Sequence, residues 1–229
     1  MTRTEAMQAD IDVGLRQYML RVYNYMASGL ALTGLVAAFV ASNDTLVAAI
    51  FGSPLKWVAM LAPVALVFFF SFRIHAMSAA TAQGVFWLYA ALNGVAFSTI
   101  FLAYTGTSIA RVFFIAAATF AAMSLYGYTT KKDLSGWGTF LFAGLVGIIV
   151  ASLVNIFLAS SALQFAISVI GVLVFVGLTA YDTQRIKEVY YEGDGHEIAA
   201  KKSIMGALTL YLDFINIFIM MLQLFGDRK

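Results

Sequence analysis

Long apolar runs alternate with short polar links along the chain. Each run has close to the ~20 residues that an α-helix needs to cross the hydrocarbon core of a membrane. Because the runs are continuously apolar rather than alternating between apolar and polar residues, they do not fit a β-barrel. The pattern predicts seven spanning helices, at about residues 22–42, 55–73, 83–104, 108–129, 138–159, 162–187 and 204–225.

We therefore predict an all-α membrane protein, a seven-transmembrane helix bundle in which the last helix, about residues 204–225, is central. The links are short apart from residues 188–203, which favours a single integral membrane domain over residues 1–229. Residues 1–21 carry mixed charges, unlike the start of a signal peptide. They are expected to form a cytoplasmic N-terminal tail.

Composition supports the membrane assignment. Hydrophobic residues make up 62% of the chain and charged residues 11%, against about 45–50% and about 25% in soluble domains. A soluble enzyme is therefore excluded. The chain has no cysteine, so disulfides and thiolate metal sites are excluded, and its net charge of +2 is too small to indicate a nucleic-acid partner.

The basic residues predict the orientation. With seven spans, ten lysines and arginines fall on the side of the N-terminus and four on the opposite side. Positive charge concentrates in cytoplasmic loops, so the N-terminus is expected in the cytoplasm and the C-terminus outside. If the run at 55–73, which contains Pro63, failed to span, the C-terminus would instead be cytoplasmic.

Two acidic residues lie inside predicted spans, where a charge is costly and therefore a candidate for function. Asp213 is near the centre of 204–225, and Asp182 lies near the end of 162–187. Counted from the cytoplasmic ends of their helices, the two lie about 13–14 Å and about 7–8 Å deep. Since consecutive helices are usually neighbours, the two carboxyl groups are expected to share one site.

Two carboxylates in a low-dielectric site cannot both ionise cheaply, so the pair is expected to share one proton and titrate as a unit. Such a pair could sense pH, bind a hard cation such as Ca²⁺ through its oxygens, or act as acid and base in hydrolysis. Alternatively, Asp182 could reach the surface and pair with Arg185. Asp213 could make a polar contact with Asn216 or Asn155 inside the bundle.

Arg73 is the third candidate. It ends the predicted helix at 55–73 on the same cytoplasmic side as Asp182. It could pair with the two aspartates and close the route to the cytoplasm, or it could simply mark a helix end that follows the positive-inside rule.

Three segments carry a resemblance to a known family. The stretch LTLYLDFINIF at 208–218 contains Asp213, LTAYDTQ at 178–184 contains Asp182, and TKKDLS occupies 130–135. In these segments, and in its length and helix count, the chain resembles the Bax inhibitor-1 (transmembrane Bax inhibitor motif) family, as a bacterial member.

The resemblance implies a protein of the bacterial cytoplasmic (inner) membrane that leaks Ca²⁺ in a pH-dependent way and is not an enzyme. It implies that Asp182 and Asp213 form the pH-sensing, ion-binding pair at which calcium would bind, and that Arg73 latches onto them in the closed state. Calcium ions, protons and the lipid bilayer are then the partners, and no cofactor is required beyond calcium as the transported or bound species.

Two rival functions remain. A regulator could bind a membrane protein, such as a protease or a member of a cell-death pathway, without transporting ions. An intramembrane aspartyl protease also places a Tyr-Asp on helix 6 and an Asp on helix 7. However, such proteases need glycines before the second Asp, and here Leu210, Tyr211 and Leu212 precede Asp213.

Overall fold

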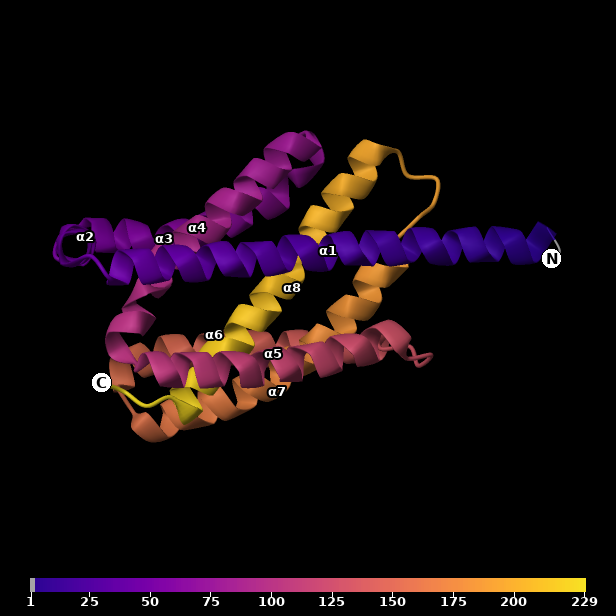
Figure 1. The fold of residues 1–229 in the computed structure, drawn as a ribbon. Coiled ribbons are helices and arrows are strands. Elements are labelled where there is room, and N and C mark those ends of the chain that lie inside the picture. The colour runs from indigo at the N-terminus through magenta and orange to yellow at the C-terminus, as the bar shows by residue number, and fades with distance from the viewer. Residues whose placement is uncertain (1–2) are drawn as a thin grey trace. The chain divides into compact units, whose positions relative to one another are not determined.

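The computed structural model describes residues 3–229, with side chains from residue 13 onward, and this part of the chain is almost entirely helical. Seven of its helices are long and apolar enough to cross a membrane, which confirms the predicted all-α membrane protein. The elements are α1 (Arg3–Ala41), α2 (Asp44–Phe51), α3 (Leu55–Arg73), the 3₁₀ turn η1 (Ile74–Ala76), α4 (Ala79–Ala103), α5 (Gly106–Thr129), α6 (Ser135–Leu158), α7 (Ser161–Glu188) and α8 (His196–Phe225) (Figure 1).

Two helices extend well beyond the predicted spans. α1 begins at Arg3 rather than near residue 22, so the expected tail is helical from residue 3 on, and residues 1–2 lie outside the described part. α8 begins at His196 instead of residue 204. Apolar length reports only the part of a helix inside hydrocarbon, and a helix can continue into water with polar residues.

The link after α1 also differs from the prediction. Residues 44–51, expected to belong to a plain connection, form α2. The side chain of Asn43 caps this helix by accepting a hydrogen bond from the Leu46 backbone N–H at 3.1 Å. With eight residues and none of them buried, α2 is too short to span a membrane.

The chain divides into two compact units. The first contains α1–α4 and residues Val189–Tyr211, and within it α1 packs mainly against α4. The two helices approach closely at Gly94, where an added Cβ would lie 2.7 Å from the Thr33 carbonyl oxygen. In a membrane such close approach supplies the packing contacts that hold helices together.

The first turns of α8 hold the α3–α4 turn within this unit. The Glu197 carboxylate accepts a hydrogen bond from the Ala79 backbone N–H at 2.6 Å, at the start of α4. One turn later, Lys201 Nζ donates to the Met77 carbonyl at 3.3 Å, just after η1. An acid at a helix N-terminus and a base beside exposed carbonyls both complement the helix dipoles.

The second unit contains residues Tyr104–Glu188 and Leu212–Lys229. Here α7 packs against both α5 and α6. At Gly127 of α5 an added Cβ would overlap the Ala180 carbonyl oxygen, so α5 and α7 touch backbone to backbone. The contact lies two residues before Asp182 and therefore positions this part of α7.

α8 is the most enclosed of the seven candidate spans. In its apolar window 67% of residues are buried, against 17–39% in the other six. Polar residues in this part of α8 must therefore find their partners inside the protein. The central position expected for the last helix stays a prediction.

Candidate functional site

Asp213 is a buried acid in the middle of a candidate span. It lies about 26 Å from the start of α8 and about 18 Å from its end, at 1.5 Å per residue. Its exposed fraction is 4%. Most residues in the neighbouring turns of α8 are apolar. Phe214 packs in edge-to-face contact with Phe113 and Phe120 of α5 at ring-centroid distances of 5.4 and 5.7 Å.

Asp182 lies on α7, six residues before the helix ends at Glu188, and is half-buried. Its carboxyl group is within hydrogen-bonding reach of the Asp213 carboxyl group. The structure therefore brings together the two acids that the sequence places in adjacent spans, and both belong to the second unit.

One oxygen of the Asp213 carboxyl group lacks a donor. Its Oδ2 atom is buried and finds no hydrogen-bond donor among the described residues. Two ionised carboxylates have no proton to share, so their contact is repulsive, whereas a proton on either group turns the contact into an O–H···O hydrogen bond. The geometry thus suits a pair that holds one proton.

The other partners considered for these acids are differently placed. The Asn216 amide donates to the Leu212 carbonyl of its own helix at 2.8 Å. Asn155 donates to Gln164 at 3.2 Å and accepts from the Ser160 backbone N–H at 3.0 Å. Neither is hydrogen-bonded to Asp213. Arg185 lies near enough to Asp182 for electrostatic attraction, but its own side chain is exposed.

Arg73 is the last residue of α3, in the first unit, and its side chain is exposed. No ion pair of Arg73 is found within the described side chains. Its role as a latch stays a prediction.

The end of α7 beside Asp182 is held by polar contacts that residue types alone did not single out. The buried Gln184 side chain accepts from the Leu134 backbone N–H and donates to the Lys132 carbonyl, both at 2.8 Å. Lys187 Nζ donates to the Tyr128 carbonyl, also at 2.8 Å. These bonds fix the α5–α6 link against α7 and therefore limit how far Asp182 can move.

The pair offers a cation few protein ligands. Within residues 13–229 no group of three or more His, Asp or Glu side chains gathers as a metal site. Ca²⁺ takes about six to eight oxygen ligands, and two carboxylates supply at most about four. A calcium ion at the pair would keep part of its water, which suits brief occupancy rather than tight binding.

Comparison with known proteins places this chain in a family. Residues 15–229 match the family described as Inhibitor of apoptosis-promoting Bax1. The chain belongs to the Bax inhibitor-1 family. Its relatives include a Rickettsia prowazekii protein, 48% identical over 99% of this chain and 96% of the relative. The inner membrane protein YbhL of Escherichia coli is 48% identical over 94% of both chains, and a Streptococcus pyogenes membrane protein is 39% identical over 94% of both.

Each of the three segments that carry the Bax inhibitor-1 resemblance contributes residues to the second unit. The segment at 178–184 supplies Asp182 and Gln184, and that at 208–218 supplies Asp213. The segment at 130–135 supplies the backbone groups that Gln184 binds. Its role here is to anchor α7. Gln184 lies between Thr183 and Arg185 in the polar last turns of α7, so its residue type gave no signal, and only its burial in the structure shows that the amide needs partners.

Proposed function

We propose that this protein is a pH-sensitive calcium leak channel or transporter of the inner membrane, gated by protonation of the Asp182/Asp213 pair. The observation that carries the proposal is the approach of two carboxyl groups from two candidate spans, one of the groups being buried with an oxygen that lacks a donor. The inner-membrane location is supported by the name of the Escherichia coli relative.

The proposed gate follows from the charge of the pair. When the two groups share a proton, α7 and α8 are joined by a hydrogen bond at this point. When the proton leaves, two neighbouring carboxylates repel each other and gain affinity for a cation. Calcium would then be attracted to the pair as cargo, and Arg73 would be the competing cation in the closed state.

The small number of protein ligands that the pair offers a calcium ion supports conduction of calcium rather than tight calcium binding. Conduction requires a site that binds an ion well enough to admit it and weakly enough to release it. Two carboxylates, with water completing the coordination, meet that requirement better than a closed cage of oxygens.

The test is calcium flux into proteoliposomes over a pH series. Asp213→Asn and Asp182→Asn should each remove the pH dependence, because neither variant retains two carboxyl groups to share a proton. Asp44→Asn changes an exposed acid on α2 and should leave the profile unchanged. Arg73→Gln should raise the flux if Arg73 is the latch.

An unchanged pH profile in both aspartate variants would overturn the proposed gate. If the reconstituted wild-type protein shows no flux, the result instead favours the regulator that acts by binding a membrane protein. Crosslinking in native membranes would then be expected to capture a stoichiometric partner. Cleavage of a transmembrane substrate that is lost in Asp213→Asn would favour a protease.

A further inference from the structure

A stripe of polar side chains follows one face of α1 within the first unit. Gln17, Arg21, Asn24 and Ser28 are spaced four, three and four residues apart, which places them on one side of a helix. All four are exposed, whereas Tyr18, Met19, Val22 and Met26 on the other side are buried. The stripe lies inside the candidate span Val13–Ala41, where exposed polar groups are costly unless something polar meets them.

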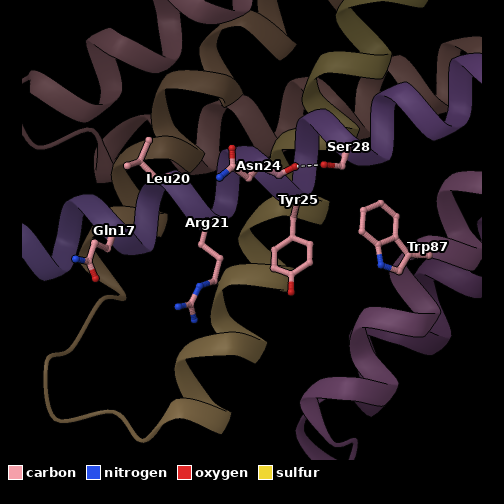
Figure 2. Close-up of a pocket in the computed structure, with 7 residues that line it drawn as sticks. All are labelled: Gln17, Leu20, Arg21, Asn24, Tyr25, Ser28 and Trp87. Carbon is pink, nitrogen blue, oxygen red and sulfur yellow. Dashed lines mark hydrogen bonds between the residues drawn. The ribbon is translucent and has the colours of Figure 1, made fainter.

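The stripe lines a shallow cavity of about 490 Å³ that is open at the surface of the first unit. Figure 2 shows the Arg21 and Tyr25 side chains extending from the same side of α1, with the Trp87 ring of α4 on the far side of Tyr25. The Tyr25 and Trp87 rings are 6.2 Å apart between centroids. The cavity is therefore lined by one cation, neutral amides and two amphipathic aromatic rings, and all the lining residues belong to the first unit.

The polar groups of the stripe are available to a ligand. Arg21 forms no ion pair with any side chain that the structure describes. The side-chain amides of Gln17 and Asn24 make no hydrogen bond among the described residues. Only Ser28 is engaged, donating to the Asn24 carbonyl at 2.6 Å. A guanidinium and two amides thus offer several unused donors on one side of the cavity.

The depth of the stripe matches the headgroup region. The 29-residue span of α1 is about 43 Å long at 1.5 Å per residue, which exceeds the about 30 Å hydrocarbon core. With Ala41 at the far boundary of the core, Arg21 falls at the near boundary. Asn24 and Ser28 then lie about 5 and about 10 Å further in.

We propose that this cavity binds the headgroup of an anionic glycerophospholipid of the cytoplasmic leaflet. Arg21 and Gln17 meet the phosphate, since a guanidinium binds phosphate oxygens through paired hydrogen bonds. Asn24 lies one turn deeper, and because helical side chains lean toward the N-terminal end, its amide is directed back toward the ester carbonyls at the boundary of the core. Tyr25 and Trp87 lie at the level where amphipathic rings are enriched in membrane proteins. The negative charge of the cytoplasmic leaflet favours the ligand.

The lipid assignment follows from depth as well as charge. A soluble phosphate would satisfy Arg21 but would leave the deeper Asn24 without a partner. A diacyl lipid places its phosphate and its ester groups at successive depths, as the stripe does, and its chains cover the apolar surface beside the cavity. This inference does not depend on the function of the aspartate pair.

The experiment is native mass spectrometry of the purified full-length protein with added phosphatidylglycerol or phosphatidylcholine. The wild type should retain phosphatidylglycerol more strongly than phosphatidylcholine. Arg21→Gln should weaken phosphatidylglycerol binding about fivefold, the effect of losing one basic residue at an anionic surface. Arg21→Lys should restore part of it.

Arg16→Gln is the matched control, because Arg16 is also exposed on α1 but lies outside the cavity. It should leave binding unchanged, and equal losses in Arg16→Gln and Arg21→Gln would overturn the site in favour of diffuse attraction. Competition by free glycerol 3-phosphate would overturn the lipid assignment in favour of a soluble phosphate. If the wild-type protein forms a dimer and only Arg21→Gln abolishes it, the lipid assignment would be overturned, because this face of α1 would then bind a second copy of the chain.

Discussion

Tyr211 and Asp213 are two residues apart on α8, and both are buried polar residues with exposed fractions of 0% and 4%. Tyr211 Oη pairs with Thr33 Oγ1 at 2.7 Å, and the Thr33 hydroxyl also lies 2.8 Å from the Ala90 carbonyl. Every polar atom of this contact has a partner. Asp213 instead meets a second acid and leaves Oδ2 without a donor.

The difference separates a structural contact from a candidate switch. A satisfied buried hydrogen bond contributes about 1 kcal/mol and has one stable arrangement. A carboxyl pair has two arrangements, with and without the shared proton, and the solution pH chooses between them. Neighbouring positions on one helix can therefore serve opposite purposes.

The largest expected effect comes from Asp213→Asn. This change removes a buried carboxylate, so it should raise stability at alkaline pH by several kcal/mol, on the order of the cost of burying one unpaired ion. The gain should shrink toward acidic pH, where the wild-type pair keeps its proton. Thermal unfolding in detergent over a pH series measures it, and a constant difference at all pH values would contradict the proton-sharing arrangement.

Gly127→Ala should have the next largest effect, about 1–3 kcal/mol of lost stability from overpacking. The new Cβ would overlap the Ala180 carbonyl oxygen and push α5 away from the part of α7 that carries Asp182. Gly147→Ala on α6 is the control, since its Cβ would meet nothing within 4 Å. If the stability of the Gly127→Ala variant equals that of the wild type, then α5 and α7 are less closely packed at Gly127 than the structure indicates.

Tyr211→Phe should cost about 1 kcal/mol, because Thr33 keeps its carbonyl acceptors and loses one partner. The loss should be the same across neutral and mildly acidic pH, in contrast to the Asp213 variant. Denaturant unfolding of both variants at two pH values checks this, and a pH-dependent Tyr211→Phe effect would remove the distinction between the two sites.

The smallest effect is expected at Asp133, in the α5–α6 link. Hydrogen bonds from the Ser135 side chain and backbone hold the pKa of Asp133 below its ordinary value. A lowered pKa contributes stability that is present above the ordinary aspartate pKa and lost as the pH falls through the folded value. Asp133→Asn should therefore weaken the protein slightly at neutral pH and not in acid. Carboxyl titration by NMR in Ser135→Ala checks the cause, since the pKa should rise.

The seven spans followed from the sequence because about twenty consecutive apolar residues have few alternatives in a membrane protein. The polar starts of α1 and α8 were missed for the same reason, since hydropathy does not distinguish a helix in water from a loop. α2 was missed because its eight residues are too few for a span and its cap is a local contact of Asn43.

The candidate site was predictable in part. Helical rise places Asp182 and Asp213 at similar depth, which is a property of residue counting. Their approach also requires the right rotation of α7 and α8 about their axes, and this depends on packing such as that at Gly127. The contacts of Gln184 could not be predicted from its partners, because they are backbone groups of the α5–α6 link, and every residue type carries such groups.

The sequence by itself determined the solvent, the number of spans, the family and the two acids that a membrane makes expensive, because each follows from the composition or order of residues. Only the tertiary structure decided which buried polar groups are satisfied. Tyr211 is hydrogen-bonded to Thr33, and Gln184 is hydrogen-bonded to backbone groups of the link before α6. Asp213 lies against another acid, and its Oδ2 atom has no donor. Whether a buried polar group has a hydrogen-bond partner depends on which helix faces are in contact. Those contacts are set by side-chain packing between segments that are far apart in the chain.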